Sequence, residues 1–166
     1  KNLPYLPEPI MVHHIPPYLA AKFQSKVALV VLDGMNYAQW VQIREALQND
    51  QDDRYEFHEQ SVYAWAPTIT SISRQAIFTG EIPMCFAGSI NSTAKEESAW
   101  KLFWENHNIM RLYTAYEKGL GRGAYTRLES IHKDATKVCG LVIDIIDRLM
   151  HNSLQGQQGL YGELAL

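Results

Sequence analysis

Short apolar runs alternate along the chain with segments of helical period. Residues 27–32, VALVVL, are continuously apolar, and residues 138–146, VCGLVIDII, form a second run of the buried type. An apolar run without polar alternation is typical of a parallel strand that helices cover on both faces. The pattern therefore predicts a central strand in each run, another strand at residues 109–116 and an extended segment at residues 55–66.

Helical spacing is found between these predicted strands. Apolar residues recur every three or four positions in residues 37–48 and 71–79, and Gly80 is suited to end the second helix. Thr93 and Glu96 have the spacing of a capping box, which predicts the start of a third helix. Strand and helix alternate throughout, so the sequence predicts an α/β fold with a mostly parallel central sheet and flanking helices.

The first part of the chain differs in composition from the rest. Five of the seven prolines lie in residues 1–18, which predicts an extended segment there and a proline-rich lead-in over residues 1–26. Residues 27–166 are enough for one α/β domain with its own core. The chain does not begin with methionine, so we expect it to be a piece of a longer protein.

Charge and cysteine content narrow the class of protein. The formal net charge is −3, which gives no overall basic field for binding nucleic acid. Cys85 and Cys139 are far apart and form no CxxC motif, which favours reduced thiols and a cytoplasmic location. No apolar run is long enough to span a membrane, and the start is not a signal peptide. We expect His13 and His14 at the surface and Cys139 as an inert core thiol.

Three candidate features fall at the ends of predicted strands, where α/β folds bind ligands. Asp33 follows the first strand, the turn that contains Thr70 follows the extended segment, and Asp147 follows the last strand. Each has an ordinary explanation, since aspartate often forms turns and threonine often caps helices. Asp147 and His151 lie four positions apart, which puts both within reach of one metal ion or makes them a simple surface pair.

Together these residue types suit phosphoryl transfer. Such a site needs carboxylates and imidazoles that hold cations, and a hydroxyl that can attack phosphorus. Thr70 opens the predicted helix, where backbone N–H groups and the helix dipole favour an anion. Arg74 lies one turn further on and could direct its guanidinium at phosphate oxygens, or else pair with a surface carboxylate.

Three segments resemble a known family. VALVVLDGM at residues 27–35 and APTITSISRQAIFTGEIP at residues 66–83 resemble the PglZ domain of the alkaline phosphatase superfamily. VIDIIDRLMH at residues 142–151 is similar to the strand-D-x-x-x-H element of that superfamily. PIMVHHIPPYLA at residues 9–20 is similar to sequence that precedes PglZ domains in phage-defence (BREX) proteins.

The resemblance implies an alkaline-phosphatase-like fold and a metal-dependent phosphoesterase, with diesters favoured over monoesters. Asp33 would be a metal ligand, and Thr70 would be the nucleophile and a ligand of the same metal. Thr68 is the alternative nucleophile if the turn is aligned differently. Arg74 would hold the phosphate of the substrate.

The second metal would be bound by Asp147 and His151, with Asp144 as a competing ligand. The resemblance thus implies two divalent cations, zinc in the first place and manganese or magnesium as alternatives. The implied partners are a phosphate-ester substrate, nucleic acid among the options, and other proteins of a defence complex. No membrane partner is expected.

One part of the superfamily pattern is missing. A later strand followed by Asp-His-Gly, and a further histidine, normally complete the site, but no such residues follow His151. We therefore expect an incomplete part of the fold, inactive alone and catalytic in the intact protein, with a degenerate domain that no longer binds two metals as another option. The alternative is a non-catalytic docking module of a multi-protein complex, for which the aromatic stripe of Trp100, Phe103 and Trp104 could be an interface, although such stripes are more often core.

Overall fold

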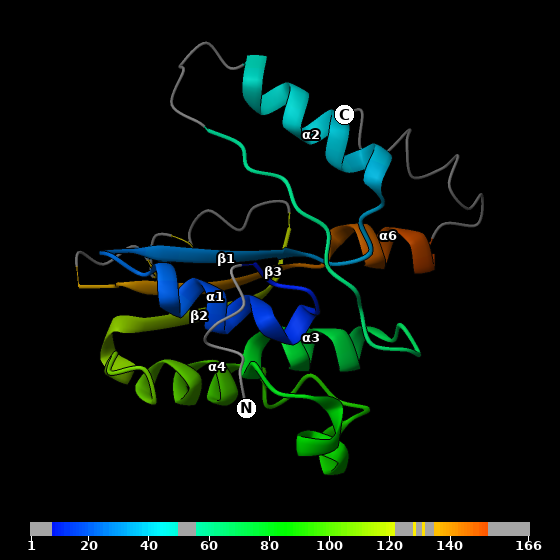
Figure 1. Cartoon of the computed structure of the whole chain (residues 1–166). Helices are drawn as coiled ribbons and strands as arrows, with labels where there is room; N and C mark the ends of the chain where they lie inside the picture. The colour runs from blue at the N-terminus through cyan, green and yellow to red at the C-terminus, as the bar shows by residue number, and fades with distance from the viewer. Residues whose placement is uncertain (1–7, 50–55, 122–127, 129–130, 132–134, 153–166) are drawn as a thin grey trace.

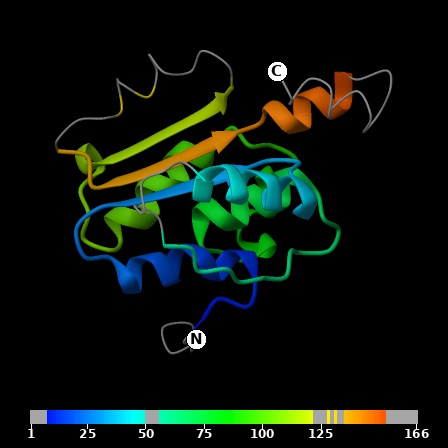
Figure 2. The ribbon, with the colours of Figure 1, turned by 90° about the horizontal axis from the view of Figure 1, so that it is seen from above.

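The described part of the chain contains a three-stranded parallel sheet. The computed structural model describes residues 8–49, 56–121, 128, 131 and 135–152. The strands are β1 (Val27–Leu32), β2 (Thr114–Leu120) and β3 (Val138–Ile143), in the order β1-β3-β2 (Figures 1 and 2). Both pairs are parallel, which confirms the predicted α/β class with flanking helices.

Helices lie on both sides of this sheet. The α-helices are α1 (Ile15–Lys22), α2 (Tyr37–Asn49), α3 (Thr70–Thr79), α4 (Glu96–Glu105) and α6 (Ile145–Asn152), and short 3-10 helices are η2 (Val12–His14), η3 (Pro83–Ser89) and η4 (Arg111–Tyr113). Helices α1, α3 and α4 gather on one face, whereas α2 lies on the opposite side and α6 continues from the end of β3 (Figure 1). The predicted helices at 37–48 and 71–79 are confirmed, and Gly80 ends α3 with a φ of 71°.

The position of β1 in the sheet differs from the prediction. Within the described residues β3 is the central strand, and β1 pairs on one side only, with β3. Val27, Leu29 and Val31 pack toward the core, but Ala28 is exposed and Val30 keeps 45% of its surface accessible. The prediction that VALVVL is a central strand covered on both faces is therefore wrong for this part of the chain, because β1 has one partner strand there and α2, on the side opposite α1, α3 and α4, leaves Ala28 and Val30 exposed.

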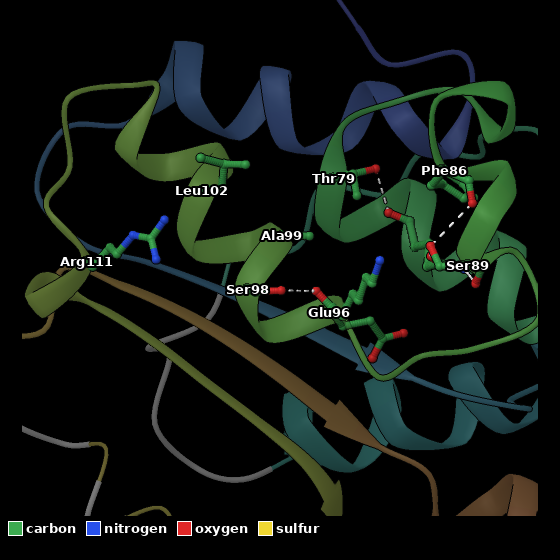
Figure 3. Close-up of a pocket in the computed structure, with 10 residues that line it drawn as sticks. Thr79, Phe86, Ser89, Glu96, Ser98, Ala99, Leu102 and Arg111 are labelled. Carbon is green, nitrogen blue, oxygen red and sulfur yellow. Dashed lines mark hydrogen bonds between the residues drawn. The ribbon is translucent and has the colours of Figure 1, made fainter.

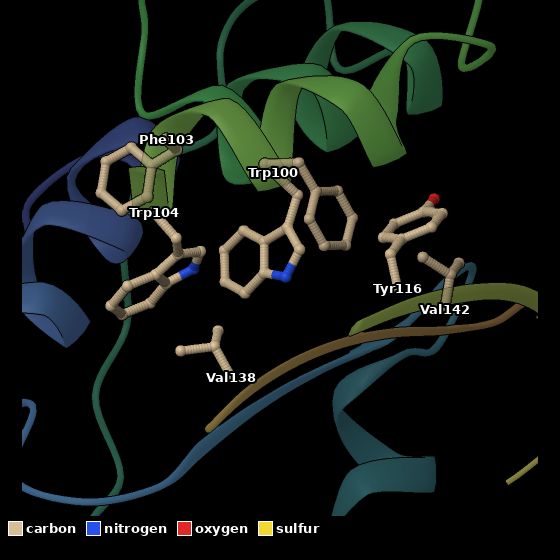
Figure 4. Close-up of a cluster of buried hydrophobic side chains, with 7 residues drawn as sticks. Trp100, Phe103, Trp104, Tyr116, Val138 and Val142 are labelled. Carbon is tan, nitrogen blue, oxygen red and sulfur yellow. The ribbon is translucent and has the colours of Figure 1, made fainter. Parts of the chain in front are cut away.

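The core is an aromatic cluster between α3, α4 and the sheet (Figure 4). It consists of Phe78, Trp100, Phe103, Trp104, Tyr116, Val138 and Val142. The rings of Phe78 and Trp100 meet edge to face, with centroids 5.5 Å apart and an interplanar angle of 90°. This is a favourable geometry for aromatic pairs. The stripe on α4 is thus core, as the sequence favours, and not an exposed interface.

The lead-in is more ordered than the sequence predicts. Residues Ile15–Lys22 form α1, although an extended segment is expected there. Pro16 and Pro17 lie in its first turn, where proline is well tolerated because the first N–H groups of a helix have no intrahelical partner. The prolines therefore start this helix and do not prevent it.

The residues before α1 dock on the segment before α3. The N–H of Val12 donates to the carbonyl of Tyr63 at 3.0 Å, and the N–H of Tyr63 donates to the carbonyl of Ile10 at 2.8 Å. These bonds form an isolated parallel bridge between Met11 and Tyr63, and Tyr63 lies in the predicted extended segment. His13 is only 5% exposed and its ring lies 5.2 Å from that of Trp65, so its expected surface position is wrong.

Two strand boundaries also shift. A 3-10 turn, η4, occupies residues 111–113, so β2 begins at Thr114 and not at residue 109. Strand β3 ends at Ile143, three residues before the predicted end, and α6 begins at Ile145. Asp144 is left as the single residue between them.

None of the helices in the described residues has both the length and the apolar character needed to cross a membrane.

Candidate functional site

The carboxyl ends of β1 and β3 lie side by side and bring two aspartates to one edge of the sheet. Asp33 follows β1, and its N–H donates to the carbonyl of Ile143, the last residue of β3, at 2.9 Å. Asp144 follows Ile143 directly. Helix α3 begins on the same side of the sheet (Figure 1). The structure thus gathers Asp33, Asp144 and the first turn of α3 at the edge where α/β folds bind ligands.

Arg74 joins α3 to the end of β1. Its Nη1 donates to Oδ2 of Asp33 at 3.2 Å, while Nε and Nη2 donate to the two carboxylate oxygens of Glu96 at 2.9 and 2.5 Å. Arg74 is 7% exposed and Glu96 is 1% exposed. The guanidinium therefore points at two carboxylates inside the protein and makes a two-pronged contact with Glu96, a geometry that its planar fork favours.

Tyr116 completes this group from β2. Its hydroxyl donates to Oε2 of Glu96 at 2.5 Å. Burial and the adjacent carboxylate of Glu96 raise the pKa of Tyr116 above its usual range. Burial lowers the pKa of Arg74, but the hydrogen bonds and charge of Glu96, with the hydrogen bond to Asp33, outweigh it and raise the pKa. Arg74 therefore stays charged and Tyr116 stays neutral.

The hydroxyl-rich turn does not cap α3. Ile69 is the N-cap residue of the helix, and no side chain makes a capping hydrogen bond there. Thr70 is the first helical residue and is exposed, and Thr68 before it is exposed as well. The hydroxyl of Ser71 instead donates to the carbonyl of Ile90 at 2.7 Å. The ordinary explanation of Thr70 as a helix cap is therefore wrong.

The second predicted metal pair is only partly described. Asp144 occupies the strand end, whereas Asp147 lies in the first turn of α6. Oδ1 of Asp144 is buried and accepts no hydrogen bond among the described residues, although Nη2 of Arg148 lies 3.1 Å away as an ion pair. The side chain of His151 lies outside the described residues. The choice between Asp144 and Asp147, and the pairing with His151, stay predictions.

The described side chains do not by themselves form a metal site. Among them, no group of three or more His, Cys, Asp and Glu side chains lies close enough to hold an ion. The side-chain atoms at the edge of the sheet that could bind a metal are the oxygens of Asp33, Thr70 and Asp144. Oxygen is the ligand type that magnesium and manganese prefer. Zinc also accepts carboxylates, but its usual partners include imidazole.

A cavity of about 300 Å³ lies between α3, η3 and α4, and Glu96 is one of its lining residues (Figure 3). Thr79, Phe86 and Ser89 form one wall, and Leu102 and Arg111 form the other. Arg111 is paired there with Glu105 at 2.8 Å. The predicted site residues Asp33, Thr70 and Asp147 do not line this cavity.

Sequence reasoning missed the roles of Glu96 and Tyr116. The predicted capping box is not formed, because α4 begins at Glu96 and the side chain of Glu96 turns inward to Arg74. A signal was present in the spacing. Glu96 precedes Trp100 by four positions and Phe103 by seven, so it lies on the buried face of the helix. A carboxylate on such a face requires a partner.

The comparison with protein families gives one match. Residues 10–160 match the model of the family described as "BREX system PglZ alkaline phosphatase-like domain". No curated protein matches the sequence. The family match covers most of the chain, including Asp33, the turn at Thr70 and the segment with Asp147. The chain therefore belongs to the PglZ family of alkaline phosphatase-like domains of BREX systems.

Proposed function

We propose that the intact protein is a metal-dependent phosphoesterase of a bacterial phage-defence system, and that Thr70 is its nucleophile. Phosphodiesters are the favoured substrates, nucleic acid among them. One observation carries the proposal: Thr70 is an exposed hydroxyl at the uncapped start of α3, the helix whose Arg74 donates to Asp33 at 3.2 Å. Membership of a hydrolase-like family supports it.

The first turn of α3 suits a phosphate group. Because no side chain caps the helix, the backbone N–H groups of Thr70 and Ser71 could donate to an anion, and the helix dipole adds to the attraction. The hydroxyl oxygen of Thr70 would attack phosphorus while the bond from phosphorus to the leaving alcohol breaks. Water would then break the bond between phosphorus and the threonine oxygen, which releases the phosphate monoester from a diester substrate and restores the hydroxyl. Thr68, also exposed, is the alternative nucleophile.

The donor chemistry at this edge fits divalent cations. Asp33 and Thr70 would hold one ion, and Asp147 with His151 would hold the other, with Asp144 as the competing carboxylate. The ions would lower the pKa of the threonine hydroxyl and withdraw charge from the phosphoryl oxygens. Zinc is our first choice, and manganese or magnesium are alternatives. Oδ1 of Asp144 is buried and accepts no hydrogen bond among the described residues, since its contact with Arg148 is an ion pair, and this supports Asp144 as the competing ligand.

The test is hydrolysis of a chromogenic phosphodiester by the intact protein with added zinc or manganese. We expect activity in the wild type and in Thr68→Ala, and none in Thr70→Ala or Asp33→Ala. Loss in Thr70→Ala with metal still bound would support Thr70 as nucleophile. Wild-type inactivity with every metal, or full activity of Asp33→Ala, would overturn the proposal.

A docking role in a defence complex is the second candidate. The aromatic stripe no longer supports it, since Trp100 and Trp104 are buried. Other apolar side chains do, because Met84 is 83% exposed and Leu112 is 67% exposed. The double variant Asp33→Ala/Thr70→Ala separates the two roles: retained capture of partner proteins with lost hydrolysis would mean that the intact protein does both.

A further inference from the structure

A chain of three ionic groups and one phenol runs from the core to the candidate metal ligand. It passes from Tyr116 on β2 to Glu96 on α4, then to Arg74 on α3, and ends at Asp33 after β1. The exposed fractions of the three ionic side chains rise from 0% for Glu96 to 9% for Arg74 and 13% for Asp33. The part of the chain nearest the edge of the sheet is therefore the aspartate.

Glu96 fixes the direction of the guanidinium. Two of the three donating nitrogens of Arg74, Nε and Nη2, are bound by Glu96, and Nη1 is left for Asp33. Tyr116 in turn donates to Oε2 of Glu96, the oxygen that also accepts from Nη2 of Arg74, and so holds the carboxylate in place. Arg74 is thus oriented from the core, and its contact with Asp33 follows from that orientation.

Stability alone does not explain this arrangement. Two carboxylates and one guanidinium have a net charge of −1 beside an aromatic core. Buried ion pairs of this kind are often no more stable than apolar residues of similar volume, because the desolvation cost offsets the attraction. A net negative charge in a group that ends at the aspartate on the edge of the sheet instead favours a bound cation.

We infer that Glu96 is a positioning residue for metal binding, which acts through Arg74 to hold Oδ2 of Asp33 and leave the other carboxylate oxygen for a divalent cation. The inference rests on the proposed function and extends it. It makes Arg74 a support for the metal ligand in place of a clamp on the substrate phosphate. Removing a residue that hydrogen-bonds to a metal ligand and orients it commonly weakens metal binding by about 10- to 100-fold.

The test is Mn²⁺ binding to the intact protein, measured by calorimetry on variants whose folding is checked by circular dichroism. We expect Glu96→Gln to weaken Mn²⁺ binding by about tenfold or more. Glu97→Gln is the matched control: it removes one charge from the same turn of α4, but Glu97 is exposed and pairs with Lys101. This control should bind Mn²⁺ as the wild type does.

A milder variant covers the case in which Glu96→Gln does not fold. Tyr116→Phe keeps the ring and every charge but removes the hydrogen bond to Glu96, and we expect about fivefold weaker Mn²⁺ binding, the effect of one hydrogen bond. If Glu96→Gln folds and binds Mn²⁺ as tightly as the wild type does, the inference is overturned. If Glu96→Gln does not fold, an unchanged Mn²⁺ affinity of Tyr116→Phe overturns it. Asp33→Asn separates it from the proposed function: if Asp33→Asn also binds Mn²⁺ normally, or the wild type binds none, the metal assignment itself fails.

Discussion

The guanidinium of Arg74 lies 3.2 Å from the carboxylate of Asp33, a residue 41 positions earlier in the chain. The contact joins the helix that begins with Thr70 to the end of the strand that precedes Asp33. Both residues are largely buried, so solvent screens their attraction less than it would at the surface. The two halves of the candidate site are therefore held in a fixed relation by an interaction between charged groups.

The first prediction concerns the stability that depends on Arg74. Arg74→Met keeps most of the volume but leaves Glu96 and Asp33 without their cation. Removal of one partner from a buried ion pair costs about 3–5 kcal/mol, and we expect a loss of that size in the free energy of unfolding. Urea unfolding followed by circular dichroism would measure it.

Arg111→Met is the control for this experiment. Arg111 also pairs with a glutamate, Glu105, at 2.8 Å, but both side chains are about half exposed. Exposed pairs contribute about 0–1 kcal/mol, so little change is expected. Similar stability of the two variants would contradict a special role for the buried network.

The fold class could be predicted from the sequence because it depends on local patterns. The apolar runs and helical periods locate β1, β3, α2 and α3 within a few residues. The position of β1 could not be predicted, because a run such as VALVVL shows only that both faces are apolar. Which face the helices cover depends on their packing, and Val30 remains exposed on the other.

The candidate site shows the same division. The residues at the edge, Asp33 and Thr70, follow from motifs at the ends of predicted elements. The partners of Arg74 do not, because Glu96 lies 22 positions away on another helix and matches a local capping motif equally well. A sequence motif gives no sign of which long-range contact will take its side chain.

The second prediction concerns the contact between β3 and the core. A Cβ atom added at Gly140 would lie 2.9 Å from Nε1 of Trp100 and 3.0 Å from Cε1 of Phe78. These distances are shorter than normal contacts, and overpacking of a core costs about 1–3 kcal/mol. We expect Gly140→Ala to lower the free energy of unfolding by that amount.

Gly88→Ala is the matched substitution at an open position, since nothing lies within 4 Å of a Cβ placed there. Thermal and urea unfolding should show a change within about 0.5 kcal/mol for this variant. If Gly140→Ala proves as stable as Gly88→Ala, α4 does not pack on the centre of the sheet as described.

The third prediction concerns the two free cysteines. Cys85 is exposed, whereas burial and the charge of Glu117 raise the pKa of Cys139 to about 11. Because the thiolate is the reactive form, the rate of labelling of Cys139 should be low at pH 8 and rise about tenfold per pH unit between pH 7 and 9. Reaction with a chromogenic disulfide, followed for Cys85→Ser and Cys139→Ser separately, would measure each rate. Fast labelling of Cys85→Ser at pH 8 would show that Cys139 is accessible and unperturbed.

The fourth prediction sets Thr70 against its neighbour Ser71. Thr70 makes no capping bond, so Thr70→Ala should change the free energy of unfolding by less than about 0.5 kcal/mol. Ser71 donates to the carbonyl of Ile90, and Ser71→Ala should lower stability by about 1 kcal/mol.

Hydrolysis by the intact protein should give the opposite order. If Thr70 is the nucleophile, Thr70→Ala should lose at least about a thousandfold in rate, while Ser71→Ala retains most of its activity. The opposition between the two readouts makes the pair informative, because replacing a residue that only caps a helix would lower stability and leave most of the activity. A Thr70→Ala protein that is destabilised by about 1 kcal/mol but still hydrolyses the phosphodiester would return Thr70 to the role of a helix cap.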